Sequence, residues 1–332
     1  MRFPMQLNMS LTGYLMKNKL KGVERFPLVL MLEPLHLCNL SCLGCGRIRE
    51  YKDTMQDKLT LQQCLDAVVE CGAPVVSICG GEPLLYPQIG ELVKEVIALK
   101  RHIHLCTNAI ELERSLDKFT PSTFLNLNFS IDGMAKTQEF TRNRKGIFDL
   151  QMKAMREAKR RGFRVFVNTT LYKESDVKEI EALFDLLTET GVDGIEATPG
   201  FSYGEVVKDM FLEREETHKK FRYIASLAHK YRLLNTPLYM KFLTGERHLD
   251  CTPWGTVTYN PQGWKGPCYL ITDKHYTSFR EMMDTTDWER FVKREDPRCR
   301  DCMMHSGVEA TAVREVGKSA RDIYEMVRWN LT

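Results

Sequence analysis

The chain has 332 residues and a mass of 38.5 kDa, with 43% hydrophobic and 27% charged residues. This composition is that of a globular protein and excludes the collagen-like, low-complexity and disordered classes. The 47 basic and 44 acidic residues leave a formal net charge of +3. That bias is too weak to indicate a nucleic-acid partner. At about 150 residues per domain, the length allows two domains or one barrel with an appendage.

The sequence predicts a cytoplasmic protein. No apolar run approaches the roughly 18 to 20 residues that cross a bilayer, and residues 1–22 lack the apolar core and cleavage site of a signal peptide. Structural disulfides are disfavoured in the cytoplasm, so the eleven cysteines indicate metal ligation, redox chemistry or simple burial.

Residues 7–21 are predicted to form a helix. Such a helix could lie on an anionic bilayer surface, or it could pack on the rest of the protein, and both interpretations stay open. Its apolar and basic residues are Leu11, Tyr14, Leu15, Lys17, Lys19 and Lys21.

A strand predicted over residues 26–32 is followed by a loop with three cysteines, Cys38, Cys42 and Cys45. The loop has no fourth cysteine, and His36 would point away from these thiols in an extended segment, which argues against a closed zinc site with four ligands. Three thiolates in one loop suit an iron–sulfur cluster with one open iron. The alternative is a set of reduced thiols in a loop.

Strand-like and helix-like segments then alternate, which predicts a parallel sheet of right-handed crossover units. Polar residues and glycines gather at the carboxyl ends of the strands, so a barrel with its site on that face is expected. The predicted strands are 26–32, 74–79, 102–106, 124–131, 163–169 and 192–198. The helical segments include 61–71, 89–99, 150–161 and 177–190.

The second group of cysteines lies near the C-terminus. Cys251 and Cys268 flank a predicted hairpin, and Cys299 and Cys302 enclose a tight turn. Four thiolates could enclose a 4Fe–4S cluster or, as the second alternative, Zn²⁺. Simple burial is the third interpretation. Two single cysteines on a predicted helix, Cys64 and Cys71, are expected to be packing residues.

The three-cysteine loop after a strand resembles the signature of radical S-adenosylmethionine (SAM) enzymes. The resemblance implies a partial (β/α)₆ barrel over residues 26–220 and a 4Fe–4S cluster on the three cysteines, with SAM bound to the open iron. Gly44 departs from the pattern, because most members place an aromatic residue there against the adenine. Adenine packing must therefore come from another residue.

The resemblance also implies which residues contact SAM. The Gly-Gly-Glu-Pro run after the second strand would present its backbone to the methionine amino group, and paired glycines permit that close approach. Polar residues at the ends of later strands would meet the carboxylate, ribose or adenine. The implied contacts are Gly80, Gly81, Glu82, Pro83, Asn108, Ser130, Asp132, Asn168, Thr198 and Pro199.

Several longer stretches resemble one family, the radical SAM adenosyltransferase of hopanoid biosynthesis (adenosylhopane synthase). This likeness implies a helical extension at 1–25, the barrel at 26–220 and a C-terminal domain with the second metal site at 221–332. Departures are Ser306, where the family carries a cysteine, the pair at 36–37, and residues 134–145. The matching stretches begin at Lys19, Arg25, Leu105, Asn168, Cys251, Gly263, Pro267 and Glu309.

The family's reaction implies that a 5′-deoxyadenosyl radical adds to the terminal alkene of a hopene (diploptene). The resulting carbon radical needs a hydrogen atom, for which Cys106 is the first candidate donor and Cys79 the second. Tyr203 and Glu205 are candidate pocket residues, or equally part of a solvated loop.

The implied partners are SAM, an apolar triterpene, an electron donor such as flavodoxin or ferredoxin, and the inner membrane surface as a peripheral contact. The alternative function is hydrogen abstraction from another lipid or a peptide, with release of 5′-deoxyadenosine. A metal-binding module without catalysis is disfavoured by the Gly-Gly-Glu-Pro run.

Overall fold

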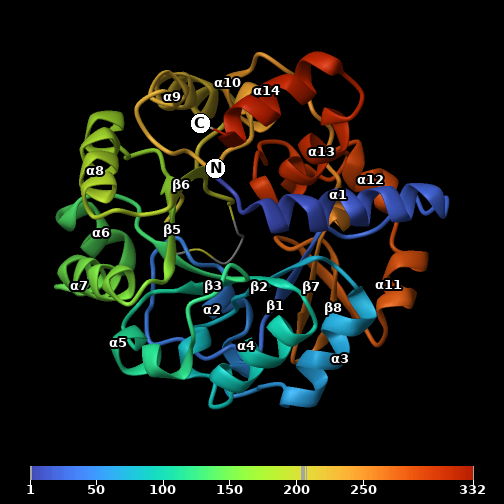
Figure 1. The fold of residues 1–332 in the computed structure, drawn as a ribbon, viewed down its shortest axis with the longest axis horizontal. Coiled ribbons are helices and arrows are strands. Elements are labelled where there is room, and N and C mark those ends of the chain that lie inside the picture. The colour runs from blue at the N-terminus through green and yellow to red at the C-terminus, as the bar shows by residue number, and fades with distance from the viewer. Residues whose placement is uncertain (1, 203–205, 207, 332) are drawn as a thin grey trace.

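A computed structural model describes residues 2–202, 206 and 208–331. One nine-stranded sheet runs through it in the order β6-β5-β4-β3-β2-β1-β7-β8-β9, and helices surround the curved sheet (Figure 1). This confirms the expected α/β class. The strands are β1 (Val29–Leu32), β2 (Val75–Ile78), β3 (His102–Thr107), β4 (Leu125–Ser130), β5 (Arg164–Leu171), β6 (Gly194–Pro199), β7 (Thr256–Asn260), β8 (Gly263–Pro267) and β9 (Thr272–Tyr276).

The first six strands pair in parallel, each with the next along the chain. Strand residues alternate between a buried outer face against the helices and an inner face toward the barrel. On β3, for example, Ile103 and Leu105 are completely buried in the main core, whereas His104 and Cys106 are only half-buried. All six predicted strands are present, with ends that differ by up to three residues.

The helices follow the predicted pattern closely. Helix α3 begins where Thr60 and Gln63 form a capping box and ends at Gly72, whose φ of 67° is left-handed. The predicted helix 150–161 begins earlier, because Ile147 and Phe148 already pack in the protein interior. The helices are α1 (Met5–Leu20), α2 (Arg47–Glu50), α3 (Leu61–Cys71), α4 (Ile89–Ala98), α5 (Leu112–Ser115), α6 (Ala135–Arg142), α7 (Ile147–Arg160), α8 (Val177–Glu189), α9 (Arg214–Ser226), α10 (Pro237–Thr244), α11 (Phe279–Thr285), α12 (Trp288–Val292), α13 (His305–Val316) and α14 (Ala320–Leu331).

The C-terminal part of the chain joins the same sheet. Strand β7 pairs in parallel with β1, and β7–β8 is the antiparallel hairpin expected between Cys251 and Cys268. One continuous core contains residues from both halves, such as Leu30 and Trp264. The sheet and its core therefore continue across the predicted boundary at residue 220.

The far edge of β6 is covered by the segment that follows α9. The Asn235 side chain accepts a hydrogen bond from the Ala197 amide (3.0 Å) and donates one to the Ala197 carbonyl (2.7 Å). Leu234 donates its amide to the carbonyl of Ile195 (2.8 Å). These bonds satisfy backbone groups that an open sheet edge would leave unpaired.

Helices α1 and α14 meet near the amino ends of the strands, on the side that faces the viewer in Figure 1. Of the two interpretations of this helix, packing on the protein applies to Tyr14 and Leu15, because both pack against the cluster of Phe26 and Leu28. A helix without a partner on one side buries whichever apolar stripe fits the protein. Among the described residues, no helix is long and apolar enough to span a bilayer.

Candidate functional site

A cavity of about 280 Å³ opens at the carboxyl ends of the parallel strands. The cavity brings together residues from far apart in the sequence, as the sheet topology requires. Of the predicted site residues, those that line it are Cys38, Cys42, Cys45, Cys79, Gly80, Gly81, Glu82, Cys106, Asn108 and Ser130.

Neighbouring elements hold the three-cysteine loop in place. The Leu43 amide donates to the carbonyl of Thr141 at the end of α6 (2.9 Å). The Asn108 side-chain amide lies 3.9 Å from the Cys38 sulfur, and the Arg142 guanidinium lies 3.9 Å from the Cys42 sulfur. N–H donors directed at sulfurs are the arrangement that an iron–sulfur cluster uses to stabilise its ligands.

The three thiols are free, and burial raises the pKa of Cys38 to about 12, with Cys42 and Cys45 adding electrostatic repulsion. A bound cation removes that repulsion, so the donor set fits a cluster. That fit rests on the kind and number of donors in the loop, since no three or more His, Cys, Asp or Glu side chains among the described residues are already gathered around one metal position.

Gly80 and Gly81, which follow β2, lie against the start of the three-cysteine loop, and side chains at these two positions would not fit there. A Cβ on Gly81 would lie 2.0 Å from the Leu37 carbonyl oxygen, and Gly80 has a φ of 100°. The Glu82 amide donates to the same Leu37 carbonyl (2.8 Å). The glycine turn is therefore packed directly on the cysteine loop.

The Glu82 carboxylate joins this turn to the end of β3. It accepts hydrogen bonds from the Thr107 hydroxyl (2.7 Å) and from the amides of Asn108 (2.8 Å) and Leu84 (3.1 Å). Burial raises the pKa of Glu82 to about 7, although the three donors oppose this shift. These three hydrogen bonds hold the glycine turn against the end of β3.

Five of the sequence-predicted SAM contacts do not line the cavity: Pro83, Asp132, Asn168, Thr198 and Pro199. Asp132 is completely buried and accepts hydrogen bonds from Arg142 (2.7 Å) and the Thr170 amide (3.0 Å). The Asn168 side-chain oxygen accepts from the Thr198 hydroxyl (3.2 Å). In this structure Asp132 orients Arg142 toward the cysteine loop. Pro83 begins a short 3₁₀ helix, Pro83–Leu85.

Sequence reasoning missed three residues that contribute to the cavity: Arg47, Arg142 and Tyr172. Arg142 lies in the segment 134–145 that departs from the family pattern, which was the only available signal. Arg47 forms a buried ion pair with Glu33 at the end of β1 and donates to the Tyr269 carbonyl (3.0 Å). These partners are distant in the sequence and meet only in the fold.

Tyr172 occupies the space beside Gly44. A Cβ on Gly44 would lie 3.2 Å from the Tyr172 hydroxyl, and Tyr172 itself is only 9% exposed. Its ring packs against Phe211 at 6.0 Å. An aromatic side chain at position 44 would collide with this ring, so the aromatic surface expected from position 44 is supplied by the end of β5.

The second group of cysteines surrounds a separate cavity of about 40 Å³. All four thiols, from Cys251, Cys268, Cys299 and Cys302, line it together with apolar side chains. Ser306, at the position where the family carries a cysteine, also lines this cavity. Gly307 is required here, because a Cβ would lie 2.4 Å from the Cys251 sulfur. The two remaining cysteines, Cys64 and Cys71, are buried in the main core, which confirms their packing role.

Family models match both parts of the chain. Residues 32–187 match the radical SAM superfamily, and residues 195–326 match a domain of unknown function, DUF3463. Residues 32–187 belong to the radical SAM superfamily. The chain therefore contains a radical SAM domain followed by a C-terminal domain, and a 4Fe–4S cluster with SAM is the cofactor set that this superfamily implies.

Curated relatives have varied activities. Fe-coproporphyrin III synthase of Methanosarcina barkeri is 28% identical over 48% of this chain and 40% of its own length. GTP 3′,8-cyclase of Synechocystis is 32% identical over 45% of this chain and 46% of its own length. The chain thus spans less than half of these two relatives. The GTP 3′,8-cyclase of Alkaliphilus metalliredigens is 26% identical over 70% of this chain and 78% of its own length.

Solved structures share the fold. Streptococcus suis SuiB bound to S-adenosylmethionine superposes with a TM-score of 0.68 at 16% identity, over 92% of this chain and 78% of SuiB. Native anSMEcpe with bound AdoMet superposes with a TM-score of 0.57 at 14% identity, over 92% of this chain and 97% of the anSMEcpe chain.

Tyr203 and Glu205, the candidate pocket residues on a loop, lie outside the described part of this chain.

We predict that Tyr172 packs on the adenine of SAM. Tyr172→Ala should weaken SAM binding about ten- to hundredfold, because stacking on a base contributes roughly 1–3 kcal/mol. Equilibrium dialysis of the cluster-reconstituted protein measures the effect, and Tyr172→Phe, which keeps the ring, is the control. Adding Gly44→Phe to Tyr172→Ala should restore binding. Unchanged affinity in Tyr172→Ala would show that the adenine lies elsewhere.

Proposed function

We propose that this enzyme joins the 5′-deoxyadenosyl group of SAM to the terminal alkene of a hopene such as diploptene, giving adenosylhopane. The cluster with its SAM supplies the adenosyl radical when bound. Two features support the proposal. The later sequence blocks resemble adenosylhopane synthase, and the thiol of Cys106 faces the cavity that the three-cysteine loop lines. The placement of Cys106 is the observation that carries the proposal.

Cys106 lies on the inner face of β3, between the neighbouring strands β2 and β4. Its sulfur is 3.4 Å from the Ser77 hydroxyl and 3.7 Å from the Asn128 side-chain amide. These two contacts orient the thiol. Burial raises the pKa of Cys106, although Ser77 and Asn128 oppose the shift, so the sulfur keeps its hydrogen at neutral pH. A protonated thiol is the form that can deliver a hydrogen atom.

Cys79 is the competing donor. It also lines the cavity, and burial raises its pKa to about 12. However, Cys79 is only 7% exposed and lies directly before the glycine turn, whereas Cys106 is half-buried on the open inner face. The greater exposure of Cys106 to the cavity favours it over Cys79 as the hydrogen-atom donor.

With the cluster bound on Cys38, Cys42 and Cys45, one electron from flavodoxin or ferredoxin would break the C5′–S bond of SAM, and methionine would leave. Addition of the adenosyl group to the alkene terminus then forms one C–C bond, consumes the π bond and leaves a tertiary carbon radical. Cys106 gives its hydrogen atom to that carbon and becomes a thiyl radical. One electron from flavodoxin or ferredoxin, with one proton from solvent, restores the thiol.

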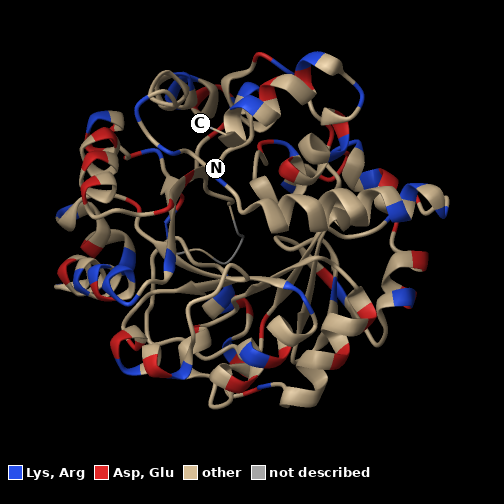
Figure 2. Cartoon of the chain, viewed as in Figure 1, with Lys and Arg blue, Asp and Glu red and all other residues tan. Residues whose placement is uncertain are grey.

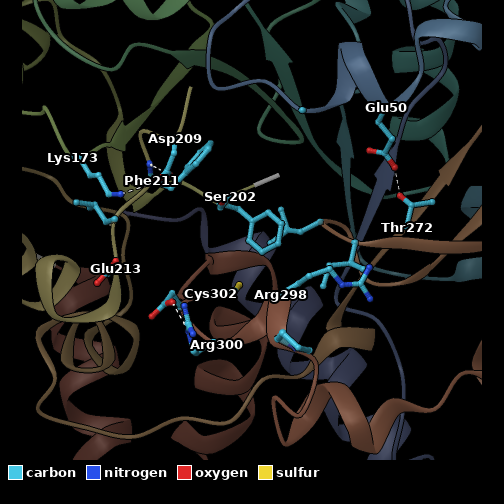
Figure 3. A pocket seen from close by; sticks show the side chains of 18 residues that line it. Glu50, Lys173, Ser202, Asp209, Phe211, Glu213, Thr272, Arg298, Arg300 and Cys302 are labelled. Carbon is cyan, nitrogen blue, oxygen red and sulfur yellow. Dashed lines mark hydrogen bonds and ion pairs between the residues drawn. The ribbon is translucent and has the colours of Figure 1, made fainter. Parts of the chain in front are cut away.

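A larger cavity of about 650 Å³ adjoins the first, and the two share Gly46, Gly200, Phe201 and Phe211 as lining residues. Figure 3 shows that charged side chains surround it, with Lys173 and Asp209 on one side and Arg298 and Arg300 on the other. This charge supports the second candidate function, hydrogen abstraction from a polar substrate such as a peptide. SuiB, which shares the fold, has been crystallised with its precursor peptide SuiA.

We further propose that the four C-terminal cysteines hold a second 4Fe–4S cluster, with Zn²⁺ as the alternative. All four thiols line one cavity. If all four bound one cluster, no iron would stay open, which suits electron transfer or structure rather than SAM cleavage. Burial, together with repulsion from Cys302 and Cys268, raises the pKa of Cys251 well above its usual value. A bound metal ion relieves that repulsion.

Anaerobic turnover of the reduced, reconstituted enzyme with SAM and diploptene tests the proposed reaction. Mass spectrometry should detect an adenosine-bearing hopane, formed in proportion to the SAM consumed. Free 5′-deoxyadenosine without the adduct would contradict the adenosyltransferase proposal and support hydrogen abstraction instead.

Replacing the donor thiol should separate radical addition from quenching. We predict that Cys106→Ala lowers the yield of saturated adduct by at least about tenfold, while SAM cleavage continues, because the carbon radical has lost its hydrogen source. Product and 5′-deoxyadenosine are measured together by mass spectrometry. Cys64→Ala, which removes a buried thiol far from the cavity, is the matched control. Equal adduct yield from Cys106→Ala would refute this role.

A further inference from the structure

Helix α14 has its apolar side turned to solvent. Ile323, Tyr324, Val327 and Leu331 are 44%, 65%, 52% and 61% exposed, and their spacing places them on one side of the helix. The only fully buried residue of α14 is Asp322. Surface helices ordinarily bury the apolar side and expose the polar one.

The polar side of α14 is held against the protein by ion pairs. Asp322 accepts a hydrogen bond from Arg247 (2.8 Å), and Glu325 pairs with Lys241 (2.5 Å). These contacts fix the rotation of the helix about its axis. These ion pairs therefore keep the apolar side of α14 turned to solvent.

Helix α1 carries a second outward apolar stripe. Met5, Met9, Met16 and Leu20 are 60%, 69%, 57% and 84% exposed. Their spacing of four, seven and four residues keeps them in one line along the helix. The opposite side of α1, which includes Leu7, Tyr14 and Leu15, already packs against the protein. Apolar residues on two opposite sides leave one stripe without a partner.

The two stripes lie on neighbouring helices, because the segment before α1 is bonded to the last turn of α14. The Arg2 and Phe3 amides donate to the backbone and side-chain oxygens of Asn330 (2.8 and 2.9 Å), and the Phe3 ring packs on Trp329 at 5.8 Å. Phe3 also contacts Phe166, near the amino end of β5, with ring centroids 6.2 Å apart. We call Met5, Met9, Met16, Leu20, Ile323, Tyr324, Val327 and Leu331 the α1/α14 face.

Basic side chains border this face. Lys17 and Lys19 lie in the last turn of α1 and Lys21 follows it, while α1 contains no acidic residue. Arg321 and Arg328 border the stripe on α14. Figure 2 shows the basic residues at the far end of α1. This pattern, apolar in the centre and positive at the border, complements an anionic lipid surface. In a symmetric dimer it would bring like charges together.

We propose that the α1/α14 face docks on an anionic bilayer. In that orientation the amino ends of the strands face the membrane, and the cofactor cavity at the carboxyl ends faces away from it. The proposal rests on exposure and charge alone and does not depend on the identity of the substrate.

Co-sedimentation of the full-length reconstituted protein with phosphatidylcholine vesicles, with and without phosphatidylglycerol, tests this docking. We expect binding to the anionic vesicles that weakens as salt is added. Lys17→Gln/Lys19→Gln/Lys21→Gln should weaken it roughly a hundredfold, because each lysine near an anionic surface contributes about fivefold. Met16→Glu and Val327→Glu should each weaken binding as well.

Matched controls carry the same changes on other surfaces. Val69→Glu replaces an equally exposed (61%) apolar residue on α3, and Lys94→Gln/Lys118→Gln/Lys136→Gln removes three exposed lysines elsewhere. Both should bind like the wild type. Equal binding by all variants would overturn the proposal, as would a dimer, seen by light scattering, that Val327→Glu dissociates in the absence of vesicle binding. Turnover of detergent-solubilised alkene by each variant separates this result from failure of the proposed reaction.

Discussion

The buried ion pair between Glu33 and Arg47 holds the cysteine loop in its place. Glu33 is completely buried at the end of β1, and Arg47 begins α2 directly after the loop. Arg47 also stacks on the Tyr269 ring (4.3 Å), beside Cys268 of the second cysteine group. One guanidinium therefore connects both groups of cysteines to the sheet. Removing one partner of such a pair would leave an uncompensated buried charge, at a cost of about 3–5 kcal/mol.

Local patterns in the sequence were sufficient to predict the parallel strands and the three-cysteine loop. Strand periodicity located β1 to β6, and paired glycines identified the turn that packs on Leu37. Contacts between residues far apart in the chain could not be predicted from the sequence. The departure of residues 134–145 from the family pattern does not tell that Arg142 faces the cysteine loop, and nothing near Tyr172 in the chain indicates its position there. The family pattern implies that Asp132 meets the SAM carboxylate or ribose, and the structure adds that its carboxylate accepts hydrogen bonds from Arg142 and the Thr170 amide.

Contacts at the two ends of the chain were also not predictable from local patterns in the sequence. Helix α1 has apolar residues on two sides, and the sequence alone does not tell which side the protein buries. Packing of Tyr14 on Phe26, at 5.5 Å between ring centroids, decides it. The hairpin between Cys251 and Cys268 was predictable from its turn residues, whereas its attachment beside β1 depends on pairing across most of the chain. The sheet thus brings the three-cysteine loop to its carboxyl ends, and the α1/α14 face lies near the amino ends.

The central claim is that a protein thiol, that of Cys106, supplies the hydrogen atom that completes the product. Turnover in D₂O after pre-incubation of the enzyme tests this claim most directly, because thiol hydrogens exchange with solvent and carbon-bound hydrogens of SAM do not. The account predicts an adduct about one mass unit heavier, with deuterium on the former internal alkene carbon. An adduct without deuterium, or one with the same deuterium content from Cys106→Ala, would contradict it.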